Sequence, residues 1–194
     1  MIPLIPDYTD QAFVRKYKKS DLAYGRNLLL VNVAKIMITN FLKEEKSNVE
    51  RLSFEGKPIT VKLLEQYLEK VITLDMEGET IDVRLKGFVD RVDLKGGNWR
   101  IIDYKTGTVE KKELEIKDWL DLRTLPELDK SFQLLTYAYL LYNKLAPDEN
   151  YEAGIISFKK IKTGFLPVSV PGENSGSKIS VRISFKTFSN EVKA

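Results

Sequence analysis

The residues that could carry out chemistry are Asp90, Asp103 and Lys105, in the stretch LKGFVDRVDLKGGNWRIIDYKTG, which spans residues 85–107. The two glycines at 96–97 suit a two-residue hairpin loop, because such loops need backbone conformations with positive φ. In a hairpin closed there, Asp90 lies opposite Asp103. Side chains alternate between the two faces of a strand, so Asp90, Asp103 and Lys105 share one face.

Two facing carboxylates repel each other, at a cost of about 0.2–1 kcal/mol when exposed and more when buried. A cation between them relieves the repulsion, and either Lys105 or a divalent metal ion can supply it. Mg²⁺ binds one or two carboxylates and completes its octahedron with water and substrate phosphate. Two acids beside a lysine therefore suit metal-assisted hydrolysis of a phosphodiester, in which the lysine orients water or stabilises developing charge.

A plainer interpretation is that these charges form a solvent-exposed face on which Lys105 neutralises the acids. The hairpin register is itself inferred, and a slip of one residue would separate Asp90 from Asp103. In the same register Asp93 pairs with Arg100 on the other face of the hairpin. We expect that pair to be structural.

The composition of the 194-residue chain excludes several kinds of chemistry. Without cysteine or histidine there is no disulfide, thiolate metal site, iron–sulfur cluster, thiol nucleophile or histidine base. The formal charge of +3 does not by itself favour nucleic acid or membrane as a partner. No apolar run approaches membrane-spanning length and no signal peptide is recognisable, so we expect a cytoplasmic protein without membrane contact.

Helices and strands are expected before and within this hairpin. Apolar residues at near-helical spacing predict a long, largely buried helix over 25–45, capped near Ser20 or Asp21. Residues 59–75 fit either a helix or a strand, and we favour a strand for the second half. Alternation from Thr80 onward predicts the next strand, so that a three-stranded meander carries the acids.

The second half of the chain predicts one strong helix and the remaining strands. After a charged loop with short helical turns, the segment SFQLLTYAYLLYNKLAP predicts a helix over 131–145 that Pro147 ends. A strand is expected at Tyr151–Lys159, where parallel pairing is allowed. Another is expected over ISVRISFKTF, residues 179–188, followed by the start of a helix at Asn190.

These elements add up to an α+β (α/β-like) protein with a mixed central sheet flanked by helices. We expect a single domain over 1–194, in which 1–55 form a helical part and 56–194 form the sheet core. The hairpin with the acids lies at the centre of the sheet, and the helix over 131–145 packs on it. The strand at Tyr151–Lys159 joins the sheet edge.

Three motifs, in this order, resemble the PD-(D/E)XK nuclease superfamily. They are G-x-x-D-R-x-D from Gly87, D-Y-K-T-G from Asp103 and Q-L-x-x-Y-A from Gln133. Their order on a strand, a strand and a helix is specific, and they cover the chain from Gly87 to Leu141. The branch that they resemble most is the nuclease domain of bacterial recombination helicase–nucleases of the RecB and AddB type. The resemblance implies a restriction-endonuclease-like fold.

The resemblance also implies roles for the strand residues. Asp90, Asp103 and the backbone carbonyl of Tyr104 would bind Mg²⁺ or Mn²⁺, and Lys105 would be the catalytic lysine beside the two aspartates. Arg91 matches the family pattern but lies on the opposite face of the hairpin, and we expect it to be structural.

From the helix, the resemblance implies that Gln133 and Tyr137 face the site, and their four-residue spacing places them on one helical face. A solvent-facing glutamine and a core tyrosine are fair alternatives for these two residues.

The function implied by the resemblance is that of a Mg²⁺-dependent deoxyribonuclease acting in DNA repair or recombination, attached to or partnered with a helicase. The alternative is a catalytically inactive fold that binds DNA or docks a helicase. No phosphate-binding loop of a helicase motor occurs in the chain. Exonuclease or endonuclease action, strand preference and polarity stay open.

The chain departs from the family pattern in two ways. Relatives usually supply a histidine or glutamate to the metal from an earlier helix, and the candidates Glu44, Glu45 and Glu65 have no supporting context. Many relatives also carry cysteines for an iron–sulfur cluster, and this chain has none. We expect the chain to be a fragment that lacks an upstream and a downstream helix, or else a decayed nuclease fold.

Overall fold

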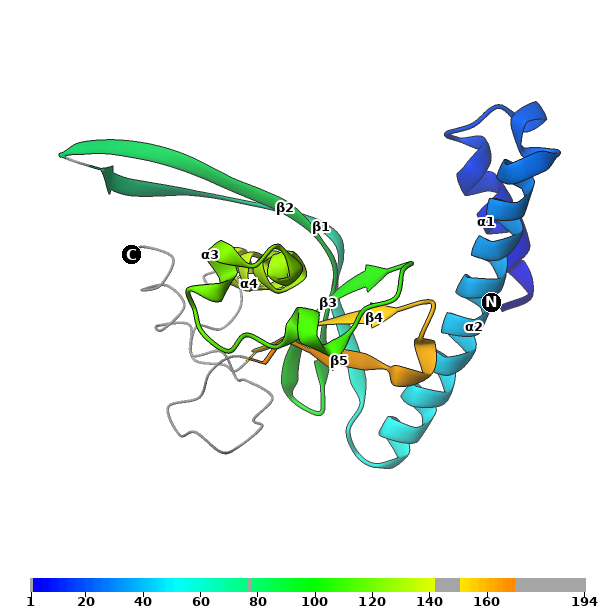
Figure 1. The fold of residues 1–194 in the computed structure, drawn as a ribbon. Coiled ribbons are helices and arrows are strands. Elements are labelled where there is room, and N and C mark those ends of the chain that lie inside the picture. The colour runs from blue at the N-terminus through cyan, green and yellow to red at the C-terminus, as the bar shows by residue number, and fades with distance from the viewer. Residues whose placement is uncertain (1, 77, 142–150, 170–194) are drawn as a thin grey trace.

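The structure is a computed structural model, and it describes residues 2–76, 78–141 and 151–169. A five-stranded sheet in the order β1-β2-β3-β4-β5 forms the centre, with helices on both faces (Figure 1). The strands are β1 (Ile59–Met76), β2 (Glu79–Lys95), β3 (Asn98–Lys105), β4 (Tyr151–Ser157) and β5 (Phe165–Pro167). The helices are α1 (Ile5–Val14), α2 (Gly25–Phe54), α3 (Asp121–Thr124) and α4 (Asp129–Leu141). This arrangement confirms the predicted α+β class.

Short 3₁₀ turns connect these elements: η1 (Ile2–Leu4), η2 (Lys19–Leu22), η3 (Lys111–Leu114), η4 (Pro126–Leu128) and η5 (Ile161–Thr163). Of these, η3 and η4 are the expected helical turns of the charged segment before α4. Among the described residues, no helix is both long enough and apolar enough to cross a membrane.

The antiparallel meander β1–β2–β3 confirms the predicted hairpins. Gly96 and Gly97, with φ of 55° and 87°, form the loop between β2 and β3. The β2–β3 register runs from Lys95↔Asn98 to Arg91↔Ile102, as expected from that loop. The ambiguous segment 59–75 is strand throughout its length.

β4 pairs in parallel with β3, with Asp103 beside Ile155, and α4 lies on the crossover between them. β4 joins the meander at the free edge of β3, as predicted, and β5 pairs antiparallel on its outer side. Gly154 permits that close pairing, since a Cβ there would lie 2.4 Å from the Leu166 carbonyl oxygen. The strand expected over 179–188 and the helix start at Asn190 lie outside the described residues.

The two faces of the sheet are covered differently. α4 packs on one face, where its Leu134 and Leu135 join Val92, Ile101 and Ile155 in the hydrophobic core, all fully buried. On the other face lies α2, which packs mainly through the Phe41 ring against the rings of Tyr104 and Phe158. The residues of β3 therefore alternate between an α4 side and an α2 side.

The prediction of a largely buried helix over 25–45 is wrong. Of the 30 residues in α2, only Val31 and Leu52 are buried. The helix is about 45 Å long at 1.5 Å per residue, and only a short part of it lies against the sheet. The predicted cap at Ser20 or Asp21 is also wrong, because α2 follows Tyr24 at the N-cap position.

β1 and β2 extend far beyond the rest of the sheet. They pair with each other from Ile59↔Lys95 to Met76↔Glu79, whereas β3 pairs with β2 only over residues 91–95. Residues 66–89 therefore form a two-stranded arm about 35 Å long, which reaches past α4 (Figure 1). We call this segment the hairpin arm.

Candidate active site

The path of β2 changes at Asp90, where the strand leaves β3. Counted from the hairpin loop, the ladder between β2 and β3 ends at the pair Arg91↔Ile102, so Asp90 is not part of it. Val89 and Val92 both lie in the core against α4 although they are three residues apart, a spacing that puts side chains on opposite faces of a regular strand. Beside Asp90, on β1, Glu65 has a φ of 48°, so both strands are irregular at this level.

The predicted ladder pair Asp90↔Asp103 is therefore wrong. Asp90 leaves the ladder and its carboxylate instead accepts a hydrogen bond from the Tyr104 backbone N–H, 2.7 Å from Oδ2. This bond holds Asp90 at the end of β3, one residue from Asp103. The two acids are brought together by a different geometry from the one that the register implies.

Asp103 is buried, with 4% of the residue exposed, on the α4 side of β3. Burial raises the pKa of its carboxyl group, the Lys105 ammonium lowers it, and the charge of Asp90 raises it further, so that the net pKa is raised. Lys105 Nζ lies 2.9 Å from Asp103 Oδ2. The pair is close but poorly angled, so this buried oxygen has no well-formed hydrogen bond among the described residues.

Lys105, Gln133 and Tyr137 form a chain of contacts between β3 and α4. Lys105 Nζ donates to Gln133 Oε1 at 3.0 Å, and Gln133 Nε2 donates to the Tyr137 hydroxyl at 2.7 Å. The Lys105 side chain is 30% exposed, so its ammonium is held from below and is open to solvent. The structure thus brings together both helix residues that the sequence predicts and the predicted lysine.

The glycine that begins the first motif allows this approach of helix and strand. A Cβ atom at Gly87 would lie 2.7 Å from Cε1 of the Tyr137 ring. Real side chains essentially never come that close, so any larger residue at this position would push α4 away from β2. Tyr137 itself is 9% exposed and belongs to the core, so it both packs and supports Gln133.

On the α2 side of the same strands lies a buried network of charges. Arg91 pairs with Glu45 of α2 and with Asp93, whose Oδ2 lies 2.6 Å from Arg91 Nη2. Asp93, fully buried, also accepts two hydrogen bonds from Arg100, each 2.8 Å long. Arg91 Nη1 in addition lies 3.3 Å from the Tyr104 hydroxyl. Arg91 and Asp93 thus lie on the opposite face from Asp103, as predicted.

Burial and charge act in opposite directions in this network. Burial alone would lower the pKa of Arg91, but its interactions with Tyr104, Asp93 and Glu45 raise it above its ordinary value, so the guanidinium stays charged. Burial also raises the pKa of the Tyr104 hydroxyl, against the opposing charge of Arg91. The hydroxyl therefore stays protonated while its backbone N–H holds Asp90.

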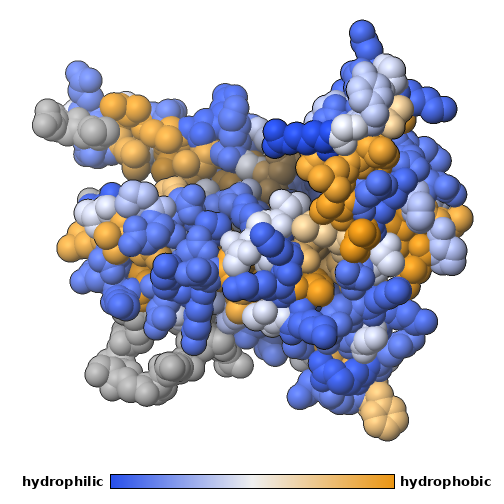
Figure 2. All heavy atoms as spheres, turned by 45° about the vertical axis from the view of Figure 1, so that its right-hand side comes forward, coloured by the Kyte–Doolittle hydropathy of each residue, from blue (hydrophilic) through white to orange (hydrophobic). Residues whose placement is uncertain are grey.

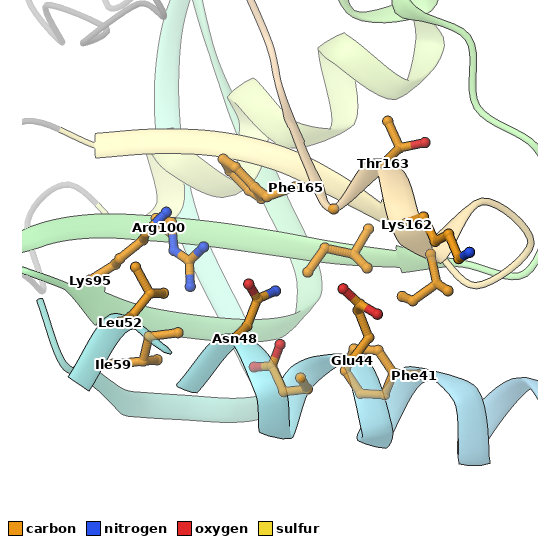
Figure 3. A pocket seen from close by; sticks show the side chains of 14 residues that line it. Phe41, Glu44, Asn48, Leu52, Ile59, Lys95, Arg100, Lys162, Thr163 and Phe165 are labelled. Carbon is orange, nitrogen blue, oxygen red and sulfur yellow. The ribbon is translucent and has the colours of Figure 1, made fainter. Parts of the chain in front are cut away.

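None of the three glutamates considered as an upstream metal ligand joins the two aspartates. Glu45 is bound to Arg91, and Glu44 lines a cavity of about 300 Å³ between α2 and the sheet. Figure 3 shows that cavity, with Glu44 and Asn48 on the α2 wall and Arg100 on the sheet. Because Arg100 lies on the α2 side of β3, the cavity is on the opposite face of the sheet from Asp103. Glu65 is exposed on β1 beside Asp90.

Asp90 and Asp103 offer carboxylate oxygens, the kind of ligand that Mg²⁺ and Mn²⁺ prefer. Within residues 2–76, 78–141 and 151–169, no three Asp, Glu, His or Cys side chains cluster around a common point. Mg²⁺ does not need such a cage, because it binds through one or two carboxylates and keeps water and phosphate as further ligands. Asp90 and Asp103 supply two carboxylates. The buried Asp103 Oδ2 has no well-aligned hydrogen-bond donor among the described residues, and a bound cation would take the place of that missing donor. The residues present therefore fit such an ion.

Sequence reasoning missed the Glu45–Arg91 pair, which joins residues 46 positions apart. The signal was present in the arginine of the G-x-x-D-R-x-D motif, since an arginine on the buried face of a strand needs acidic partners. Nothing in the local pattern, however, indicates which glutamate of α2 it meets.

Comparison with known proteins gives a match at the level of the family. A family model described as the PD-(D/E)XK nuclease superfamily matches residues 5–183. No curated protein and no solved structure gives a significant match.

Proposed function

The chain belongs to the PD-(D/E)XK nuclease superfamily, and from this premise we propose that it is a divalent-metal-dependent nuclease that hydrolyses the phosphodiester bonds of DNA. The observation that carries the proposal is the convergence of Asp90, Asp103 and Lys105 at the end of β3. A buried aspartate with a raised pKa, beside a second acid and a partly exposed lysine, is typical of a catalytic site rather than of a stabilising ion pair.

In the proposed site, Asp90, Asp103 and the backbone carbonyl of Tyr104 hold Mg²⁺ or Mn²⁺. When bound, such an ion polarises the scissile phosphate and lowers the pKa of a coordinated water. The Tyr104 N–H fixes one oxygen of Asp90 and leaves the other available. Burial keeps Asp103 in place on β3, away from bulk water.

Lys105 acts on the substrate in this proposal. An ammonium has three N–H donors: one bonds to Gln133, and a second faces Asp103 in a close but poorly angled ion pair. The third is left for a phosphate oxygen or for the attacking water, where it stabilises the negative charge that develops in the transition state. Gln133 and, through it, Tyr137 are positioning residues that hold the ammonium at this point.

Cleavage of labelled single-stranded and double-stranded DNA tests the proposed function. We expect cleavage with Mg²⁺ or Mn²⁺, none with EDTA, and none for Asp103→Asn. Absence of cleavage with either metal, from a folded chain that also binds neither metal, would overturn the proposal.

The ordered motifs at Gly87, Asp103 and Gln133 support a finer assignment. We propose a nuclease of the RecB and AddB type that acts in cytoplasmic DNA repair or recombination, with a helicase as partner or as a neighbouring domain. Strand preference in a co-purified helicase–nuclease assembly would test this assignment.

A second candidate function is a catalytically inactive module that binds DNA or docks a helicase. The observation that favours it is the small number of ligands at the site: among the described residues no third acid joins Asp90 and Asp103, and Lys105 is already paired with Asp103. A module of this kind has no need to bind a divalent ion, so metal affinity separates it from the nuclease.

The raised pKa of Asp103 predicts how metal binding depends on pH. Protons compete with the cation for this carboxylate, so affinity falls as the pH drops through the raised pKa, and the fall begins at a higher pH than for an ordinary exposed aspartate. Mn²⁺ titrations at several pH values between about 8 and 4.5 measure this. Affinity that stays constant down to the pH at which an ordinary aspartate takes up a proton would contradict the prediction.

A further inference from the structure

An exposed aromatic pair lies on the hairpin arm close to the candidate active site. Tyr67 is directly opposite Phe88 in the β1–β2 ladder, with ring centroids 5.1 Å apart and an angle of 56° between the rings. Tyr67 is 40% exposed and Phe88 is 58% exposed. Cross-strand aromatic pairs do stabilise two-stranded sheets, but that role does not require more than half of Phe88 to face solvent.

The position of this pair relates it to the acids. Phe88 precedes Asp90 by two residues, about 7 Å along the strand. The neighbouring Leu68 and Val89 face the core beneath α4, so Tyr67 and Phe88 point to the other side, on which α2 lies. Figure 2 shows a hollow between the hairpin arm and the helices α1 and α2, with apolar side chains gathered along the arm.

Charge along the arm is segregated by distance from the site. Its basic residues, Lys70, Arg84 and Lys86, lie between its base and its midpoint; Arg84 and Lys86 are on the face of Phe88, whereas Lys70 is on the α4 face, over the Tyr139 ring. The segment 71–83 at the tip carries only acidic charges. Near the base of the arm, the acid on the aromatic face is Glu69, and Arg84 Nε lies 3.4 Å from its Oε1, which offsets its charge. A polyanion is thus attracted to the base of the arm and repelled from its tip.

We propose that Tyr67 and Phe88 form a stacking platform for the bases of single-stranded DNA, whose backbone reaches Asp90 at the base of the arm. The inference deepens the proposed function and rests on it for DNA as the substrate. Aromatic side chains bind unpaired bases of any sequence through their faces, and nearby cations follow the backbone. Bases in a duplex are already stacked on one another, so the platform favours an unpaired strand.

The ring of Tyr67 is oriented for this role. Its hydroxyl donates a hydrogen bond to Glu69 Oε2 at 2.5 Å, which limits rotation of the side chain. Lys86 lies opposite Glu69 in the ladder and is exposed on the same face as Phe88. The two rings and this lysine therefore offer one continuous surface of apolar planes and positive charge.

Fluorescence anisotropy with labelled oligothymidine and with a blunt duplex of equal length tests the proposal. EDTA and low salt are used, so that no cleavage occurs and phosphate contacts remain strong. We expect Phe88→Leu and Tyr67→Leu each to weaken binding of oligothymidine about 5- to 100-fold, because loss of one stacked base has an effect of that order. Binding of the duplex should change much less.

Leucine is chosen because it keeps apolar bulk at an exposed strand position, so the arm stays paired. Phe88→Tyr should restore binding, since it restores the aromatic face. Ile81→Ala is the matched control, because Ile81 is 45% exposed on the same strand but nearer the tip. Oligothymidine binding equal to that of the parent chain in both leucine variants would overturn the proposal, as would equal losses for the duplex or for Ile81→Ala.

This experiment separates the platform from catalysis. Binding is measured without metal, so a chain that never cleaves DNA still shows the platform if it exists. If the parent chain cleaves DNA but the Phe88→Leu variant binds oligothymidine as tightly as the parent chain, the proposed function stands and the platform is overturned.

Discussion

Replacing Lys105 by alanine is expected to reduce metal-dependent DNA cleavage by about 10²–10³-fold, the effect of losing one donor aimed at developing negative charge. The side chain is partly exposed and fills no core space, so the fold should persist. Metal binding should be unchanged or tighter, because the variant removes the cation that now pairs with Asp103. Single-turnover cleavage rates and Mn²⁺ titration of the same preparation measure both effects.

The matched control for this prediction is Lys111→Ala, which removes an exposed lysine of η3. We expect it to cleave as the parent chain does. Gln133→Ala should give a smaller loss than Lys105→Ala, because the ammonium stays but loses the acceptor that orients it. Cleavage by Lys105→Ala at the parent rate would contradict a catalytic role for this lysine.

Asp93→Ala is expected to lower the free energy of unfolding by about 3–5 kcal/mol, because it leaves two buried guanidinium groups without their shared partner. Asp93 is fully buried and is bound by both Arg91 and Arg100. Domains of ordinary stability unfold with about 5–15 kcal/mol, so such a loss removes a large share of the total. Urea denaturation followed by circular dichroism measures it.

Glu50→Ala serves as the control for the loss of one acidic partner. Glu50 pairs with Lys46 at 3.7 Å on the exposed surface of α2, with both side chains about two-thirds exposed. Exposed helix pairs of this kind are worth about 0.3–0.5 kcal/mol, so Glu50→Ala should change stability little. A change for Asp93→Ala as small as that for Glu50→Ala would show that the buried network does not stabilise the fold.

Local signals in the sequence were sufficient for much of the sheet. The Gly96–Gly97 loop fixed the register of β2 and β3 as far as Arg91, and alternation from Thr80 onward identified β2, whereas the first half of β1 was left open between helix and strand. The spacing of Gln133 and Tyr137 correctly placed both on the face of α4 that meets Lys105. Each of these inferences depends on residues close together in the chain.

The departure of β2 from β3 at Asp90 could not be predicted in the same way. A strand irregularity changes the face to which a side chain points but leaves no mark in the composition of the motif. In a regular strand Val89 and Val92 would lie on opposite faces, whereas both lie in the core. The sequence predicted that Asp90 and Asp103 lie close together because they would pair across the ladder. In the structure they lie close together because the Tyr104 N–H binds the Asp90 carboxylate.

The errors about α2 have a similar cause. Apolar spacing along 25–45 predicts which residues share a helix face, but it does not show whether the sheet extends far enough to cover that face. The pairing of Glu45 with Arg91 likewise depends on where α2 crosses the sheet, which is a property of the whole fold.

The central claim is that Asp90 and Asp103 form a divalent-metal site, and Mn²⁺ titration calorimetry of the chain beside Asp90→Asn and Asp103→Asn tests it most directly. We predict that Mn²⁺ binds to the parent chain at neutral pH and that neither variant binds it. The free energy of unfolding of Asp103→Asn should not fall below that of the parent chain, because a buried carboxylate with a raised pKa is costly to keep charged. Parent-like binding in both variants, or no binding to the folded parent chain, would contradict the account.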